Sequence, residues 1–175
     1  MAAAARMIVT HGLRAPTALI AQEAGVSNGS LFTYFETKAD LFNQLYLELK
    51  TDMASAGLEG FPASGRLREQ MLHIWSNLAR WAVASPAKRR ALSLLSVSDD
   101  ITKASSAAGQ EAMAPIAEVL ERSRAKGPMR DAPMEFVVAI LTSVVGATID
   151  FMVQDPTNAD KHCRNGFDAF WRAIT

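Results

Sequence analysis

The chain has a single cysteine, Cys163, among its 175 residues. One cysteine allows no disulfide within the chain and no cysteine-based zinc site, which favours a reducing cytoplasmic setting. An excess of either charge is also missing, because 18 Lys and Arg residues balance 18 Asp and Glu residues. This balance argues against a uniformly basic surface for nucleic acids, although it leaves room for a local DNA-binding site.

Patterns typical of enzymes and metal sites are missing as well. The histidines His11, His73 and His162 are far apart, and none has a metal-binding partner three or four residues away. His162 and Cys163 are neighbours, so on a helix their side chains point about 100° apart and form no catalytic dyad. The sequence also has no glycine-rich phosphate loop and no nucleophile elbow. We therefore expect no enzyme activity, no metal and no cofactor.

Hydrophobic runs are shorter than a membrane span requires. The longest apolar run without charge extends from Phe136 to Ile149 and is closed by Asp150. A transmembrane helix needs about 20 apolar residues, so this run suits a buried helix better. Residues 1–5 are small and apolar but lack the preceding basic residues of a secretory signal. We expect a cytoplasmic protein that does not contact a membrane.

The chain is rich in helical periodicity, and 49% of its residues are hydrophobic. Apolar residues recur every three or four positions, and glycine and proline fall between these stretches rather than within them. The pattern predicts an all-α protein with about nine helices. They are expected over residues 3–11, 17–24, 27–35, 37–54, 64–84, 85–95, 100–126 (which a break near 107–109 would divide), 133–153 and 155–175.

The segment from Thr17 to Lys38 is the most informative. Its two helices share a short turn with Gly25, which is the geometry of a helix-turn-helix. Gly25 supplies the positive φ of the turn, and Ser27 is the expected N-cap of the second helix. Residues 37–40 have capping-box spacing. Ile20, Val26 and Leu31 are expected to form a small shared core. The second helix exposes short polar side chains that can approach base edges in a major groove: Asn28, Gly29, Ser30 and Thr33.

This segment resembles the DNA-binding domain of TetR-type transcriptional regulators. The matching residues are Ile20-Ala21, Ala24-Gly25-Val26-Ser27, Gly29, Leu31-Phe32, Tyr34-Phe35, and Lys38 with Leu41. The resemblance implies phosphate or backbone contacts to DNA from Thr17, Tyr34 and Lys38, and a groove-facing surface of Asn28, Gly29, Ser30 and Thr33. The rest of the chain resembles the family in its length, its all-α character and its two last helices.

Two features depart from the family pattern. Phe32 stands where the family often has tyrosine, so a phosphate-contacting hydroxyl is absent. The first helix begins without a basic arm, and residues 1–35 hold only Arg6 and Arg14 against Glu23. We expect either a natural N-terminus that is longer than this one or a low affinity for non-specific DNA.

The resemblance implies a DNA-binding domain over residues 1–50 and a domain over residues 51–175 that senses a ligand and dimerises. Aromatic and methionine side chains suit an adaptable apolar cavity, although each of them also suits an ordinary core. On the helix over 64–84, Trp81 continues the apolar stripe and is expected in the core, whereas Trp75 is expected to line the cavity. The expected cavity wall is Met71, Trp75, Leu78, Leu92, Met113 and Phe136.

The helix over 133–153 is apolar on nearly all sides, so it must bury two faces. The last helix adds further aromatic side chains. By resemblance this pair forms a four-helix bundle between two copies of the chain, and the alternative is a central helix of a monomer. The expected interface residues are Leu141, Val144, Val145, Thr148, Met152, Phe167, Phe170 and Trp171.

Together these observations predict a homodimeric, ligand-responsive repressor that a small apolar molecule releases from a palindromic double-stranded DNA operator. The alternative is an all-α dimeric interaction or ligand-binding module that has lost DNA binding. The near-neutral first 50 residues and the missing basic arm favour this alternative. Binding to an operator at two salt concentrations separates the two hypotheses.

Overall fold

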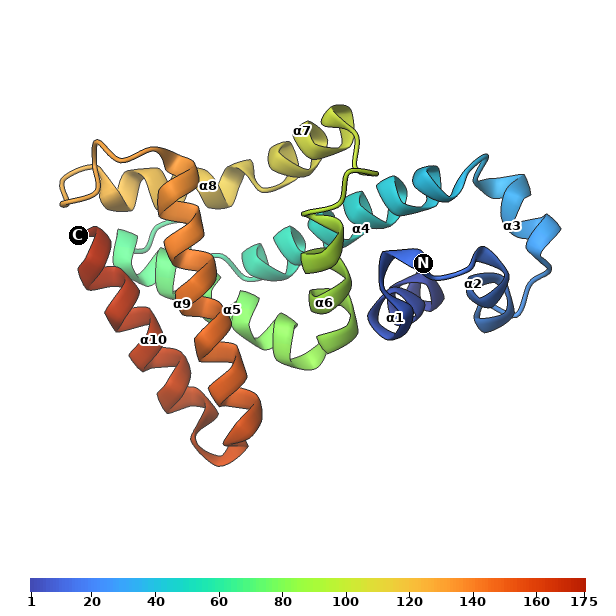
Figure 1. Ribbon diagram of the computed structural model, residues 1–175. Helices are drawn as coiled ribbons and strands as arrows, with labels where there is room; N and C mark the ends of the chain where they lie inside the picture. Colours follow the sequence, from blue (N-terminus) through green and yellow to red (C-terminus); the bar gives the residue numbers. More distant parts are fainter. The chain divides into compact units, whose positions relative to one another are not determined.

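The computed structural model describes residues 1–175, and all of its regular elements are helical (Figure 1). The prediction of an all-α protein is therefore confirmed. The α-helices are α1 (Ala2–His11), α2 (Thr17–Glu23), α3 (Asn28–Tyr34), α4 (Lys38–Leu58), α5 (Leu67–Ala84), α6 (Pro86–Leu95), α7 (Lys103–Ala112), α8 (Ala114–Arg124), α9 (Met134–Gln154) and α10 (Ala159–Ile174). Two short 3-10 helices are η1 (Gly12–Arg14) and η2 (Pro156–Asn158).

The helix expected over 100–126 is two helices, which raises the number from about nine to ten. The break falls at Met113, between α7 and α8, rather than near 107–109. Pro115 explains the position, because proline has no backbone N–H and its ring clashes with the carbonyl of the preceding helical turn.

The chain forms two compact units. The first comprises Met1–Asp52 and Ser85–Met113, and the second comprises Met53–Ala84 and Ala114–Thr175. The boundary expected near residue 50 lies next to the end of the first segment. Helices α6 and α7 group with α1 to α3 and most of α4 in the first unit.

The first unit holds α7 against α4 through a buried amide. Asn43 is only 9% exposed. Its Nδ2 donates to the carbonyl oxygens of Ala39 at 2.8 Å and Asp100 at 2.7 Å, and its Oδ1 accepts from the Thr102 N–H at 2.9 Å. A buried amide is stable only when its polar atoms are paired, so these bonds fix the start of α7 on the helix that follows α3.

The second unit is built around Trp75 of α5. Its indole N–H donates to the Cys163 carbonyl oxygen at 3.0 Å, and its ring stacks on Phe170 with centroids 5.7 Å apart. Trp75 is 1% exposed, whereas Trp81 is half-buried. Trp75 therefore holds the core position that was expected for Trp81. Relative to buried Met71, Trp75 lies about 40° round the helix and Trp81 about 80° on the other side, so Trp75 is nearer the centre of the buried face.

Helices α9 and α10 form an antiparallel hairpin, the orange and red helices of Figure 1. Their close approach requires Gly166, because a Cβ at that position would overlap the buried Thr148 side chain. The loop before α9 is held by Arg124, which is 6% exposed. Its Nη1 donates to the carbonyl oxygens of Met129, Arg130 and Ala132 at 2.6, 3.1 and 2.7 Å.

Helix α9 is long and apolar enough to cross a membrane, by length and composition alone. It extends beyond the uncharged run of Phe136 to Ile149 at both ends, where it includes Glu135 and Asp150. Only 22% of its most apolar window is buried in the structure. Phe136 and Phe151 are 56% and 57% exposed. The helix therefore presents a large apolar surface that its own unit leaves uncovered.

Candidate nucleic-acid interface

Local capping bonds set the geometry of the helix-turn-helix. Gly25 has a φ of 71°, which confirms the left-handed turn residue expected there. The next N–H, that of Val26, donates to the Ala21 carbonyl oxygen at 3.0 Å and closes the turn. Ser27 caps α3 as predicted, since its side-chain oxygen accepts from the Ser30 N–H at 3.0 Å.

The small core under this turn differs from the prediction at one residue. Ile20 and Leu31 are 1% and 7% exposed, as expected, but Val26 is 44% exposed. Val26 lies in the turn rather than in either helix, and turns run along the surface where their backbone is solvated. The two helices are thus joined through Ile20, Ala21 and Leu31.

The outer face of α3 consists of short polar side chains. Asn28, Gly29, Ser30 and Thr33 are all exposed. The Thr33 hydroxyl donates to the Gly29 carbonyl oxygen at 3.2 Å, and the Ser30 and Ser27 hydroxyls lie 2.8 Å apart. Asn28, the first residue of α3, keeps its side-chain amide free of such bonds. Its amide is therefore available to pair with an adenine edge, which asparagine binds in a bidentate manner.

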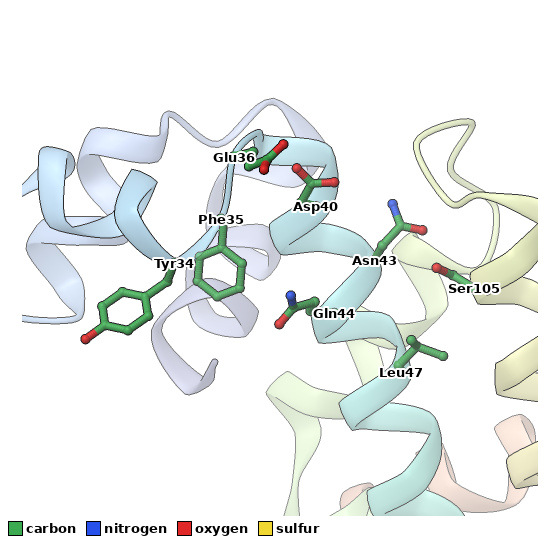
Figure 2. Close-up of a pocket in the computed structure, with 8 residues that line it drawn as sticks. All are labelled: Tyr34, Phe35, Glu36, Asp40, Asn43, Gln44, Leu47 and Ser105. Carbon is green, nitrogen blue, oxygen red and sulfur yellow. The ribbon is translucent and has the colours of Figure 1, made fainter.

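Tyr34 and Phe32 extend the exposed surface of α3, with 78% and 42% of each residue accessible. Tyr34 borders a shallow hollow of about 370 Å³ (Figure 2). In this view its hydroxyl points away from the carboxylates of Glu36 and Asp40, which line the same hollow. Those carboxylates would repel a phosphate, so a DNA contact here depends on the tyrosine tip rather than on the hollow.

The start of α4 confirms the capping box. The Thr37 N–H donates to Asp40 Oδ2 at 2.9 Å, and the Asp40 N–H donates to Thr37 Oγ1 at 3.1 Å. Lys38 is half-buried, with its Nζ 5.2 Å from the centre of the Phe42 ring. Because Asp40 is engaged in the cap, the Lys38 ammonium has no carboxylate partner and remains available to a phosphate.

Two arginines flank this domain and differ in their partners. Arg6 of α1 forms an ion pair with Glu23 of α2, with Nε and Oε1 2.7 Å apart. Arg14 is exposed at the end of η1, close in sequence to Thr17, the half-buried first residue of α2. Arg14 was not predicted as a DNA contact from the sequence. Its position shortly before α2 indicates that it can contact a phosphate.

The expected cavity wall is divided between the two units. Leu92 is a buried residue of the first unit, to which Met113 also belongs. The second unit contains Met71 and Trp75 in its core, Leu78 half-buried on α5, and Phe136 exposed on α9. None of these six side chains lines the hollow beside Tyr34 or a second hollow between α5 and α10.

The expected dimer-interface residues lie mostly on the inner side of the last two helices. Thr148, Met152, Phe167 and Phe170 are buried within the second unit, and Leu141, Val144, Val145 and Trp171 are half-buried. The opposite side of α9 carries an exposed stripe at three- and four-residue spacing, made of Phe136, Ala139, Ser143, Ala147, Asp150 and Gln154. We call these six residues the outer stripe.

Comparison with known proteins shows similarity along the whole chain. Residues 1–45 match the family described as bacterial regulatory proteins, tetR family. A protein of Shewanella sp. PV-4 described as a TetR family transcription regulator is 28% identical, with a TM-score of 0.85 over 98% of this chain and 94% of that chain. A TetR family regulator of Marinobacter aquaeolei VT8 is 23% identical, with a TM-score of 0.80 over 98% and 91% of the two chains. PfmR of Thermus thermophilus, also a TetR family regulator, shares the fold at 17% identity, with a TM-score of 0.69 over 99% and 97%.

Proposed function

Because this chain is a TetR family transcription regulator by its N-terminal domain and its fold, we propose that it represses transcription from a palindromic operator. A small apolar molecule would release it from the DNA. The observation that carries the proposal is the outer face of α3, where short polar side chains follow a capped, glycine-containing turn. Such a face is small enough to enter a major groove and polar enough to pair with base edges.

The proposed contacts fall into two classes. Asn28 and Thr33 read base edges, Gly29 lets the α3 backbone approach the DNA closely, and Ser30 adds a hydroxyl. Phosphate contacts come from residues at the edges of the motif, where they fix the orientation of the domain without reading sequence. They are Arg14, Thr17, Tyr34 and Lys38.

Useful specificity requires two copies of this domain. One recognition helix covers only a few base pairs, so a dimer that reads two half-sites is needed. We propose that the outer stripe of α9 forms the dimer contact. Large exposed apolar patches mark protein or membrane contacts, and the small residues Ala139 and Ala147 allow another helix to pack closely. Asp150 within the stripe disfavours a lipid environment, so a second copy suits the stripe better than a membrane does.

The proposed response to the effector is a shift between conformations. A small apolar ligand that binds better to a dimer with unsuitable half-site spacing would shift the population away from DNA. Within the second unit, the proposed wall of its cavity comprises Met71, Trp75, Leu78 and Phe136. Side chains such as Met71 and Trp75 would have to move from the core to admit it, because both are 1% exposed. Opening a cavity in this way has a cost, which the differential affinity of the ligand must exceed.

The test begins with selection of binding sites from a random pool of duplex DNA, followed by titration of the selected duplex and a scrambled duplex at two salt concentrations. The proposal predicts preference for a palindrome that persists at both salt concentrations. Absence of any sequence preference would instead support the dimeric interaction module that has lost DNA binding. Because the chain has no net charge, a module that has lost DNA binding is the second candidate function.

A further inference from the structure

A second hollow lies in the second unit, between α5 and α10. Its volume is about 420 Å³, which lies within the roughly 300–1,000 Å³ typical of sites for small molecules. One wall is a single stripe of α5 at four-residue spacing, from Arg68 through Leu72 and Ser76 to Arg80. The other wall is a stripe of α10 that includes Asp160, Arg164 and Asp168. We call this hollow the arginine groove.

The charges of the arginine groove do not cancel. At one end Arg68 Nη2 lies 2.5 Å from Asp168 Oδ1, so this pair is neutral. Arg80 donates to the uncharged amide oxygen of Asn77 at 3.0 Å. Arg164 forms no ion pair, although an aspartate lies four residues away on either side of it. With Arg68 and Asp168 paired, Arg80 and Arg164 face only Asp160, which leaves one positive charge in excess.

The floor of the arginine groove carries no formal charge, and its accessible apolar side chain is the half-buried Leu72. It includes Leu72, Phe167 and Cys163, and the latter two are 0% and 5% exposed. The Cys163 sulfur lies 3.9 Å from the Ser76 hydroxyl. Burial raises the pKa of the Cys163 thiol, so the sulfur carries no charge at neutral pH. The Arg68 guanidinium carbon lies 5.2 Å from the centre of the Phe167 ring, so a short apolar ligand body can rest on Leu72, while an anionic group of the same ligand meets the arginines at the rim.

We propose that the arginine groove binds a small organic monoanion, a carboxylate with a short apolar body. The carboxylate lies between Arg80 and Arg164, whose planar guanidinium groups can each donate two hydrogen bonds to it. The apolar body covers Leu72. The groove shares no lining residue with the proposed wall for an apolar effector. An effect of the carboxylate on operator binding would rest on the proposed function, whereas binding to the groove would not.

The structure supplies its own reporter for this binding. Trp75 lies directly behind the floor, since its indole N–H donates to the Cys163 carbonyl oxygen and its ring meets the Phe167 ring edge-on at 6.0 Å. A ligand seated in the arginine groove should change the fluorescence of Trp75. A chain with Trp81→Phe and Trp171→Phe keeps Trp75 as its only tryptophan.

The experiment titrates this single-tryptophan chain, without DNA, with benzoate and with hexanoate. Benzamide, which has no charge, and inorganic phosphate, which has no apolar body, are the comparison probes. We expect saturable binding of both carboxylates and weaker binding of both comparison probes. No saturable response to either carboxylate at millimolar concentration would overturn the proposal, and so would equal binding of phosphate or benzamide. A failure to bind DNA leaves this result unaffected, so the two proposals fail independently.

Two charge variants, which are expected to change the affinity for benzoate in opposite directions, locate the site. Arg164→Gln should weaken benzoate binding by about tenfold or more, as expected for loss of a charged hydrogen-bond partner. Asp160→Asn should strengthen it, because it removes the only unpaired negative charge of the groove. Arg122→Gln on α8 is the matched control, since Arg122 is also an exposed arginine of the second unit. Equal effects of Arg164→Gln and Arg122→Gln, or a weakening by Asp160→Asn, would place the binding elsewhere.

Discussion

Helices α3 and α9 each leave one side uncovered, but the two sides have opposite chemistry. The open side of α3 carries Asn28 and Thr33, whose polar groups water can solvate at little cost. Helix α9 instead exposes Phe136, Val138, Phe151 and Val153, which water solvates poorly. The free protein can therefore leave α3 exposed to water at little cost in free energy, whereas covering α9 lowers the free energy of the protein.

This contrast has a consequence for the order of assembly. Apolar surfaces of this kind are typical of permanent interfaces, and polar charged surfaces are typical of complexes that form and dissociate with salt. We therefore expect the dimer to exist before DNA is bound and to persist after release. The first two sets of variants below each change one of these two helices and leave the other intact.

The largest expected effect follows from a charge in the outer stripe. Ala147→Arg should convert the dimer into a folded monomer, because a long charged side chain replaces the methyl group at the centre of the outer stripe, where a second helix is proposed to pack closely. Ala147 is exposed in the single chain, so the substitution should not disturb folding of that chain. Light scattering at micromolar concentration measures the mass, and circular dichroism checks the helix content.

Ala108→Arg on α7 is the matched control, because Ala108 is also an exposed helical alanine and lies in the first unit. It should remain a dimer. A dimeric Ala147→Arg variant would show that the outer stripe is not the contact. Phe170→Asp cannot serve this purpose, since Phe170 is 0% exposed and a charge there should unfold the second unit.

The next largest effect concerns α3. Asn28→Ala and Thr33→Ala should each change which bases are preferred, by ~1–3 kcal/mol for each base contact that is lost. Both residues are exposed, so stability should change little. The measurement compares the affinity of each variant for operators with every base substituted in turn. If both variants lose the same affinity for every sequence, neither side chain reads bases.

Features that depend on a few neighbouring residues were predictable from the sequence. The positive φ of Gly25, the Ser27 cap and the reciprocal cap of Thr37 and Asp40 each involve groups within four residues. Residue type and spacing specify such bonds almost alone. The position of the α7–α8 break also depends on a local feature, since Pro115 marks it, although the break was expected near residues 107–109.

Features that depend on which face meets which neighbour were less predictable. Helix α9 is apolar on nearly every side, so its sequence has no polar face that would tell inside from outside. The inner residues Thr148 and Met152 were consequently expected at a dimer interface, although the α9–α10 hairpin buries them. Trp75 rather than Trp81 holds the core position for a related reason, because the two aromatic residues flank the same apolar stripe. Only tertiary packing decides between such alternatives.

A smaller, sequence-independent effect is expected at the edge of the DNA-binding surface. Lys38→Gln should weaken binding to operator and scrambled duplexes alike and lower the salt slope by ~1 for each half-site. The reason is the loss of one ammonium that has no carboxylate partner within the protein. Arg14→Gln should behave in the same way, and Arg6→Gln is the comparison because Arg6 is already paired with Glu23. A change in base preference by Lys38→Gln would contradict its role as a phosphate contact.

The smallest expected effect lies at the turn between α9 and α10. Asp155 Oδ2 accepts from His162 Nε2 at 3.0 Å and from Asn158 Nδ2 at 2.9 Å. These hydrogen bonds, that from His162 foremost, hold the pKa of Asp155 below its ordinary value. A carboxyl with a lower pKa in the folded state stabilises the fold above its unfolded pKa of about 4, and this contribution disappears as pH falls through the folded pKa.

Asp155→Asn should therefore lower the Tm slightly at neutral pH, and the difference from the unmodified chain should close on acidification. The effect is small because the pair is exposed to solvent and screened. Thermal unfolding from neutral to acidic pH measures it, with Asp99→Asn as a control at an exposed aspartate outside the hairpin. A Tm difference that stays constant with pH would remove Asp155 ionisation as the cause. The same pH-dependent difference in the Ala147→Arg background would show that this turn stabilises the single chain, independently of the partner that covers the outer stripe.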